Sequence, residues 1–324
     1  EDFVAQRAAR AQALYILGDL FEAWIGDDDD GETGMRVAAA LAPLRRTGVP
    51  AYFVHGNRDF LLGPDYAERA GLTLLPEASV IDLYGTPTLV LAHSAHPAFD
   101  KAAHFLDVKT IRTPLRADFT ADPAAMQAAI TPDTVMLVGS APAYPHGVVD
   151  PIPEIAAIAQ ARGIWMHVDA CVGGYFAPFA RMLGVELPGF DFGVPGVTSI
   201  SADLHKYGYA AKGASTLFFA DEASFAHMAY KFENWPRGQY ATHTLVGTRA
   251  GGAIAAAWAV MNYLGVDGYK AVTQRVLDTR RAIERGVQAL GLQTLGKPEL
   301  SIVAFGSPTH DIAAIGQGLQ RRGW

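Results

Sequence analysis

The stretch GVTSISADLHKYGYAAKGAS, residues 196–215, decides the fold of this chain of 324 residues. It opens with a run at Val197–Ser201 that favours a β-strand. A polar segment with several glycines follows, which predicts a loop. His205 and Lys206 follow the predicted strand. Ligands of α/β proteins gather at the carboxyl ends of strands, so this stretch predicts a binding edge of a sheet.

Short apolar runs alternate with helical patterns on both sides of this stretch. Strands are predicted at 13–17, 51–54, 80–83, 88–91, 108–112, 134–138, 164–168 and 216–219, and helices at 35–46, 97–106, 122–130, 151–162 and from 251 onward. Each strand and helix pair has the length of a β/α crossover. The fold class is therefore expected to be α/β with a mostly parallel sheet.

Composition excludes several classes of function. Hydrophobic residues make up 50% of the chain and charged residues 18%, which predicts one large or two ordinary folded domains rather than disorder. The net charge of -7 argues against a nucleic-acid partner. The single cysteine, Cys171, excludes an intramolecular disulfide framework and predicts a reducing compartment, the cytoplasm. No apolar run is long enough to predict a transmembrane segment.

Three residues far apart in the chain together predict a pyridoxal 5'-phosphate site. Asp169 ends an apolar strand within HVDAC (167–171), and a carboxylate buried there needs a partner such as the protonated ring nitrogen of the cofactor. Lys206 follows the next predicted strand, where a partly desolvated cleft suits a Schiff-base lysine. His96 begins a predicted helix and can stack on the ring. Each residue alone also fits a structural role, but the ordered set favours the cofactor.

Residues 94–324 resemble the fold-type I pyridoxal-phosphate enzymes of the group II decarboxylase class. Their sequence motifs are similar to those of sphingosine-1-phosphate lyases. This resemblance rests on the stretch quoted first and on four further motifs: AHPAFDKAAHF, DTVMLVGSAPAYPHGVVDP, HVDAC and GTRAGG. The resemblance implies that Lys206 is the Schiff-base lysine, Asp169 the partner of the pyridinium and His96 the stacking imidazole. It implies further roles for these residues: His205 as a phosphate or substrate neighbour, Lys212 on the substrate phosphate, Ser140 near the ring hydroxyl or substrate, Tyr207 in the cleft, and Gly247 and Thr248 on the cofactor phosphate across a homodimer interface.

The implied activity is a carbon–carbon lyase that cleaves a phosphorylated long-chain amino alcohol. An amino-acid decarboxylase with the same cofactor remains an alternative, although Lys212 favours a phosphorylated substrate. Residues 93–264 are expected to form the large domain. Its amino-terminal part is expected to be incomplete, because an unrelated sequence occupies the place where the family has the loop that binds the cofactor phosphate. Residues 265–324 are expected to form a long helix and the start of a truncated small domain.

Residues 1–92 contain motifs that predict a different kind of site, one for a divalent metal ion. Asp19, in GDLFE (18–22), follows one predicted strand, and Asn57, in GNRD (56–59), follows the next. Parallel strand ends would bring the two side chains together as oxygen donors for a divalent metal ion.

These motifs resemble the calcineurin-like metallophosphoesterases, in particular the UDP-2,3-diacylglucosamine hydrolases of lipid A synthesis. The resemblance implies ions of the Mn²⁺ type on Asp19 and Asn57, with His93 as a remnant ligand and Arg58 facing phosphate. The family's Asp-x-His and Gly-His-x-His motifs are not found, so Mn²⁺ is expected only if the ligand set is completed. The whole chain is therefore expected to be a chimera of two truncated families, and an inactive chimeric fragment is a further alternative.

Overall fold

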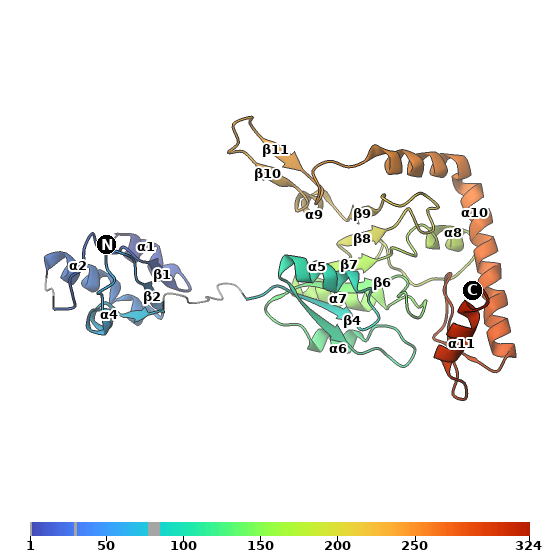
Figure 1. Cartoon of the computed structure of the whole chain (residues 1–324), viewed down its shortest axis with the longest axis horizontal. Helices are drawn as coiled ribbons and strands as arrows, with labels where there is room; N and C mark the ends of the chain where they lie inside the picture. Colours follow the sequence, from blue (N-terminus) through green and yellow to red (C-terminus); the bar gives the residue numbers. More distant parts are fainter. Residues whose placement is uncertain (1, 29–30, 77–84) are drawn as a thin grey trace. The chain divides into compact units, whose positions relative to one another are not determined.

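The computed structural model describes residues 2–28, 31–76 and 85–324. The chain divides into two compact units, Glu1–Leu83 (the first unit) and Tyr84–Trp324 (the second unit) (Figure 1). The strand expected at 80–83 lies outside the described residues.

The first unit is a small three-stranded parallel sheet with short helices. Its strands, in the spatial order β1-β2-β3, are β1 (Leu14–Leu17), β2 (Ala51–Val54) and β3 (Leu72–Leu74). Its helices are α1 (Asp2–Gln6), the 3₁₀ helix η1 (Ala8–Arg10), α2 (Glu32–Leu41), α3 (Leu44–Thr47) and α4 (Pro64–Ala70). Phe53 and Tyr66 are buried at its centre.

The single helix expected at 35–46 is two helices in the structure. The ring of Pro43 has no N–H to donate and crowds the preceding turn, so α2 ends before it and α3 begins after it. Gly48 then ends α3 in the left-handed conformation, with φ 78°, which glycine adopts at little cost.

The second unit is built on a six-stranded sheet in the spatial order β5-β4-β6-β7-β8-β9. Its strands are β4 (Thr88–Ala92), β5 (Lys109–Thr113), β6 (Thr134–Ser140), β7 (Trp165–Asp169), β8 (Ser199–Ala202) and β9 (Thr216–Phe219). All neighbours are parallel except β8 and β9. No helix lies between β8 and β9 to carry the chain back across the sheet, so β9 returns antiparallel.

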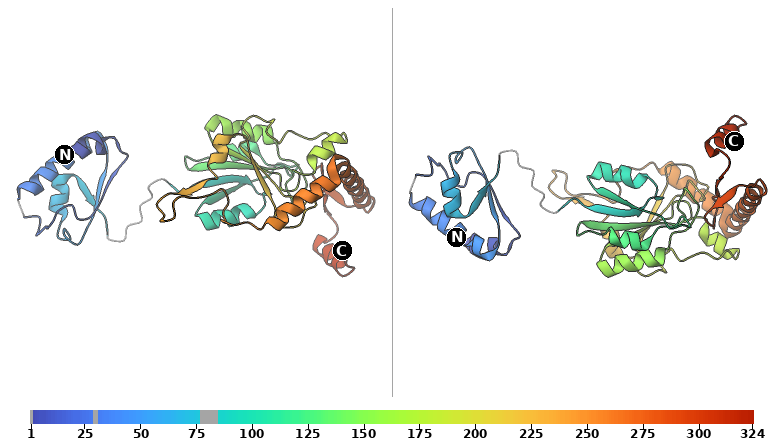
Figure 2. Two further views of the ribbon diagram at one scale, coloured as in Figure 1. Left: turned by 90° about the horizontal axis from the view of Figure 1, so that it is seen from above. Right: turned by 90° about the horizontal axis from the view of Figure 1, so that it is seen from below.

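Helices cover both faces of this sheet. They are α5 (Ala98–Leu106), α6 (Pro123–Ala128), α7 (Ile152–Arg162), α8 (Ala177–Met182) and α9 (Glu222–Ala226). Helices α5 and α7 lie on opposite faces (Figure 2). The main core includes Leu137, Ile155 and Met166, while a smaller cluster on the other face packs Leu91 and Val138 against Phe99 of α5.

Strand β4 belongs to the second unit. It lies between β5 and β6, and Val90 and Leu91 are fully buried on its two faces. A strand buried on both faces is an interior strand, and it stabilises the sheet only when both neighbours pair with it. The structure therefore groups residues 88–92 with the residues that follow them, whereas the sequence grouped them with residues 1–87.

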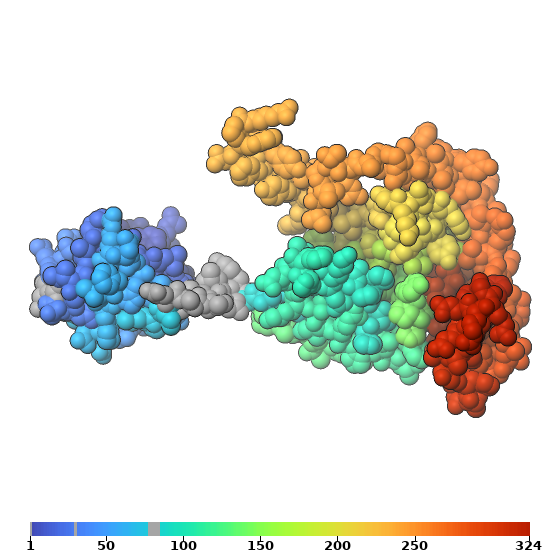
Figure 3. Space-filling model, viewed as in Figure 1, coloured from blue at the N-terminus to red at the C-terminus, as the bar shows by residue number. Residues whose placement is uncertain are grey.

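The carboxyl-terminal part begins with a long helix, α10 (Gly251–Ala289), which is broken at Gly265, where φ is 55° and ψ is -173°. It is followed by the antiparallel pair β12 (Gln293–Leu295) and β13 (Ala304–Gly306) and by α11 (Ile312–Gln320). Ahead of α10, the hairpin of β10 (Tyr230–Phe232) and β11 (Tyr240–Thr242) projects from the body of the second unit (Figure 3).

The buried carboxylate of Asp150 ties two loops to the sheet. Its Oδ1 accepts a hydrogen bond from the amide of Ala121 at 2.8 Å, and its Oδ2 accepts one from the amide of Ser140 at 2.8 Å. Burial raises the pKa of Asp150 to about 6, although the two amide hydrogen bonds act in the opposite direction. The chain following β6 is thereby fixed at the carboxyl edge of the sheet.

We expect Asp150→Asn to lower the free energy of unfolding by about 1–3 kcal/mol, because one amide would face an NH₂ group instead of an acceptor. Urea denaturation at pH 7 measures this change. Asp107→Asn is the matched control, since Asp107 is exposed in a left-handed conformation that asparagine also adopts. Equal stability of the two variants would contradict the role given to Asp150.

Candidate active site

Five parallel strands end at one edge of the second unit's sheet, and polar residues lie at this edge. Ser140 of β6 pairs in register with Asp169 of β7, which pairs with Ser201 of β8. Paired residues on neighbouring strands project from the same face. Ser140, Asp169 and Ser201 therefore lie side by side, although they come from three separate crossover units.

Asp169 offers one carboxylate oxygen at this edge. Its Oδ1 accepts a hydrogen bond from the amide of Cys171 at 3.1 Å, and Ser201 Oγ lies 3.4 Å from the same oxygen. Its Oδ2 makes no hydrogen bond to any residue that the structure describes. This arrangement suits a cofactor that brings its own N–H donor, as the protonated pyridine ring does.

His167 lies beneath this edge, two residues before Asp169. Its Nδ1 lies 2.8 Å from Ser199 Oγ and its Nε2 lies 3.2 Å from Ser201 Oγ. Burial lowers the pKa of His167 to about 4, against the opposing effect of the Asp169 charge. His167 is therefore a neutral imidazole at physiological pH.

Lys206 is held by a carboxylate that the sequence analysis did not single out. Its Nζ lies 3.0 Å from Oδ2 of Asp203, whose Oδ1 accepts a hydrogen bond from Ser215 at 2.6 Å. Burial acts to raise the pKa of Asp203, but the hydrogen bonds from Ser215 and Lys206 outweigh it and lower that pKa. His205 Nε2 lies 3.7 Å from the same carboxylate, and its Nδ1 lies 3.3 Å from the Ala214 carbonyl oxygen. In the sequence, the i, i+3 spacing of Asp203 and Lys206 could have indicated this ion pair.

His96 stands at the start of α5, as its sequence context predicts. Its Nδ1 accepts a hydrogen bond from the amide of Ala98 at 3.1 Å, and its ring lies 6.5 Å from that of Tyr144. It lines a pocket of about 390 Å³ with His93 and Arg112. Ser201 and Asp203 line a different pocket, which Phe99 also lines, and the amide of Phe99 donates a hydrogen bond to the carbonyl oxygen of His96 at 3.2 Å.

The pocket that includes Ser201 and Asp203 is the largest of those described, at about 920 Å³. Apolar side chains dominate its wall, including Phe219 of β9 and Trp258 of α10, and Arg249 adds a cation. Such a wall suits an aliphatic ligand that carries an anionic group at one end.

Four further expected site residues do not line this pocket. Lys212, Gly247 and Thr248 are exposed in loops before β9 and α10. The ring of Tyr207 packs against Phe176 at 4.8 Å, and Tyr207 lines a separate pocket beside α10 with Arg275. These positions leave Lys212 accessible to a ligand and place Tyr207 at the edge of the core.

In the first unit, a buried carboxylate joins the two strand-end loops. Asp59 accepts hydrogen bonds from the amides of Gly56 at 2.8 Å, Leu20 at 2.6 Å and Asp19 at 3.2 Å. With its amide oriented to donate, Asn57 Nδ2 lies 3.1 Å from Asp19 Oδ1.

The metal ligands expected from the sequence do not form a centre in the part of the chain that the structure describes. Among those residues, no group of three or more His, Cys, Asp or Glu could hold a metal ion. His93 follows β4 in the second unit, whereas Asp19 and Asn57 belong to the first. Arg58 forms an ion pair with Glu22 at 2.5 Å.

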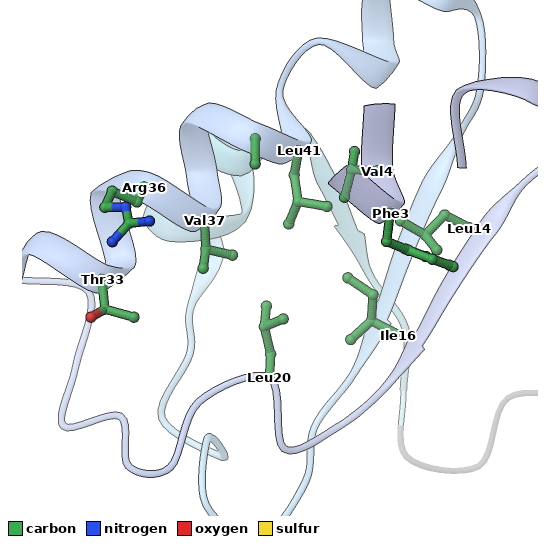
Figure 4. Close-up of a pocket in the computed structure, with 10 residues that line it drawn as sticks. Phe3, Val4, Leu14, Ile16, Leu20, Thr33, Arg36, Val37 and Leu41 are labelled. Atoms are coloured by element: carbon green, nitrogen blue, oxygen red, sulfur yellow. The ribbon is translucent and has the colours of Figure 1, made fainter. Parts of the chain in front are cut away.

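The first unit also has an apolar pocket of about 500 Å³ between β1, α1 and α2 (Figure 4). Its wall includes Phe3, Leu14, Ile16 and Val37, with Arg36 at one side. Leu20, which follows Asp19 in the loop after β1, also lines this pocket.

Comparisons with known proteins match most of the chain. The family model described as the pyridoxal-dependent decarboxylase conserved domain matches residues 73–306. The chain is 43% identical over 239 residues to a sphingosine-1-phosphate lyase of Oryza sativa, which covers 74% of this chain and 44% of the relative. It is also 43% identical over 242 residues to sphingosine-1-phosphate lyase 1 of Rattus norvegicus, covering 74% and 42%. The chain thus spans less than half the length of these relatives.

Solved structures agree with this match. A sphingosine-1-phosphate lyase structure from Burkholderia pseudomallei is similar with a TM-score of 0.71 and 40% identity, covering 74% of this chain and 55% of that one. A glutamate decarboxylase structure from Lactobacillus brevis is similar with a TM-score of 0.65, covering 80% and 59%. At 20% identity, the second likeness shows a shared fold alone.

Among the described residues, no helix has both the length and the apolar character needed to cross a bilayer.

We expect His167 to make folding stability depend on pH. The folded pKa of about 4 lies below the ordinary 6.5, so an unfolded chain takes up a proton that the folded chain does not. The contribution of His167 to the free energy of unfolding should therefore fall as the pH drops from about 6.5 towards about 4, by up to about 1.4 kcal/mol per pH unit. Asp150, whose pKa is raised to about 6, acts in the opposite direction over part of this range. Urea denaturation across this range measures the effect.

His167→Gln provides the comparison, because it removes this titration and leaves that of Asp150 in place. The difference in stability between the parent and this variant should narrow as the pH falls. Parallel pH curves would show that His167 is not a neutral buried imidazole.

Proposed function

Because the chain belongs to the pyridoxal-dependent decarboxylase family, we propose that it binds pyridoxal 5'-phosphate at the carboxyl edge of its six-stranded sheet. We further propose that this site, in the whole protein, cleaves a carbon–carbon bond of a phosphorylated long-chain amino alcohol. The observation that carries the proposal is that Asp169 ends β7 and Lys206 follows the adjacent parallel strand β8, with one oxygen of Asp169 available to a ligand.

The residues at this edge fit the cofactor. Asp169 Oδ2 would hold the ring nitrogen, and Lys206 Nζ would attach the cofactor covalently. When bound, the cofactor supplies an electron sink for the bond that is cleaved. Asp203 Oδ2, at 3.0 Å, would hold the lysine amine in position.

The other residues from the resemblance keep their proposed roles around this centre. Ser140 lies beside Asp169 in register, where it can meet the ring hydroxyl or the substrate. His96 would stack on the ring, His205 would neighbour phosphate or substrate, and Tyr207 would border the cleft. In a homodimer, Gly247 and Thr248 would reach the cofactor phosphate of the partner.

Two features support a phosphorylated long-chain substrate. Lys212 is exposed in the loop that follows Lys206, where an ammonium group can meet a phosphate. The apolar pocket of about 920 Å³ offers a surface for an aliphatic chain. An amino-acid substrate needs neither feature, so amino-acid decarboxylation is the alternative that the tests below separate.

The domain division and location are also proposals. We propose that residues 93–264, together with β4 of the same sheet, act as a large domain and residues 265–324 as the start of a small one, in a cytoplasmic protein. A metal-dependent hydrolase activity for residues 1–92 rests on the contact between Asp19 and Asn57 alone. Two ligands are too few for a bimetallic centre, so further ligands would have to complete it. The chimeric origin of the chain stays a prediction.

We expect mixing the protein with pyridoxal phosphate to give a yellow absorbance band, which Lys206→Ala abolishes because that variant lacks the amine that binds the cofactor covalently. Absorbance spectra after gel filtration measure the band. Lys212→Ala is the matched control and should keep it. A band of equal strength in the Lys206 variant would overturn the assignment.

We expect Lys212→Ala to weaken binding of a phosphorylated long-chain amino alcohol about tenfold or more, because one charge-assisted contact is lost. Isothermal titration calorimetry of the cofactor-loaded protein measures the affinity. Binding of the same alcohol without its phosphate should not change. A loss of equal size for both compounds would argue against a phosphate contact and would favour the decarboxylase alternative.

A further inference from the structure

Five polar side chains form a continuous chain of contacts across β7 and β8. Trp165, His167 and Asp169 alternate along β7, and Ser199 and Ser201 pair in register with the last two of them. Alternate residues of a strand share one face of the sheet. His167 and Ser199 are buried, with 7% and 3% of their surface exposed. These polar groups must therefore be satisfied by one another.

The distances make the chain continuous from the indole to the carboxylate. Trp165 Nε1 lies 2.7 Å from Ser199 Oγ, which lies 2.8 Å from His167 Nδ1. His167 Nε2 lies 3.2 Å from Ser201 Oγ, which lies 3.4 Å from Asp169 Oδ1. No solvent is needed to complete any of these four contacts.

The two ends of the chain fix the direction of every hydrogen bond. An indole N–H only donates and a carboxylate only accepts. Ser201 must give its one hydroxyl proton to Asp169, so the neighbouring His167 Nε2 must carry a proton and donate it. Since His167 is neutral, its Nδ1 carries no proton and accepts the hydroxyl proton of Ser199. Ser199 in turn accepts from Trp165, and all four bonds point towards Asp169.

A second contact uses the remaining hydrogen-bonding capacity of the Ser201 hydroxyl oxygen. Cys171 Sγ lies 3.3 Å from Ser201 Oγ, and the amide of Cys171 donates to Asp169 Oδ1. The hydroxyl oxygen of Ser201 thus accepts two hydrogen bonds and donates one, which is its full complement. No lone pair of Ser201 remains to exchange these partners, so the position of Asp169 Oδ1 is tightly determined.

We propose that Trp165, Ser199, His167 and Ser201 are positioning residues that form a one-way hydrogen-bond chain, and that this chain holds Asp169 Oδ1 so that Oδ2 faces the cofactor ring. The inference rests on the proposed function for the identity of the partner of Oδ2. Hydrogen bonds in series polarise one another, so each donor strengthens the last bond to the carboxylate. A merely space-filling histidine would work equally well with its proton on either nitrogen.

The first test measures the proton on His167 in the protein without cofactor. The ¹⁵N NMR spectrum of histidine-labelled protein distinguishes the two neutral tautomers, and His167→Gln assigns the signal. We expect the Nε2–H tautomer in the parent. Ser201→Ala removes the acceptor of that proton, so the Nδ1–H tautomer should appear, and Ser201→Thr should restore the parent spectrum because it keeps the hydroxyl.

The second test measures cofactor affinity by absorbance titration. Loss of one hydrogen bond to a charged group predicts that Ser201→Ala weakens binding of pyridoxal phosphate about tenfold. Ser201→Thr should recover most of the affinity. Ser301→Ala is the matched control, because the buried Oγ of Ser301 makes no hydrogen bond in the part of the chain that the structure describes.

The two tests separate this inference from the proposed function. An Nδ1–H tautomer in the parent, or a Ser201→Ala variant that matches Ser301→Ala in both tests, would overturn the hydrogen-bond chain. A parent protein that gives the Nε2–H tautomer but binds no cofactor would overturn the proposed function and, with it, the role of Oδ2. The hydrogen-bond chain that ends on Asp169 Oδ1 would then be supported by the NMR spectra alone.

Discussion

The parallel register of β4, β6, β7 and β8 is the constraint on which the candidate site depends. In a parallel sheet the strands run in one direction, so the loops that follow them meet at one edge. This register aligns Ser140, Asp169 and Ser201, which are separated in the chain by whole crossover helices. A shift of one residue in β7 would turn Asp169 to the opposite face and remove it from its neighbours. The chemistry of the edge therefore depends on backbone pairing in the interior of the sheet.

The two faces of this sheet serve different purposes. The face under α7 is apolar, and residues such as Leu137, Met166 and Val168 are fully buried there. The opposite face combines the small cluster under α5 with a polar chain through His167 and the large pocket beside β9. Alternation along each strand allows this division, because neighbouring residues project to opposite sides. The apolar face stabilises the fold, while the other face can carry groups that would be costly in a dry core.

Two buried carboxylates hold loops in place through backbone amides. Asp150 accepts the amides of Ala121 and Ser140, and Asp59 accepts three amides in the first unit. A carboxylate has several acceptor sites, so one side chain can satisfy backbone groups from segments that are distant in sequence. Such loops lack strand or helix partners of their own. Each carboxylate thus replaces missing secondary structure at a point where the chain must turn.

The sequence by itself determined the alternation of strands and helices and most of their bounds, because apolar periodicity is a local property. Strands expected at 134–138 and 164–168 correspond to β6 and β7, and the motifs placed Asp169 and Lys206 at strand ends. Only the tertiary structure decided that β4 lies inside the second sheet, that Pro43 divides one expected helix, and that Asp203 and His167 support the site. It also set His96 and His93 in one pocket with Arg112. Strand order, ion pairs and hydrogen-bond chains join residues that are far apart in sequence, and their free energy depends on distances that exist only after the chain has folded.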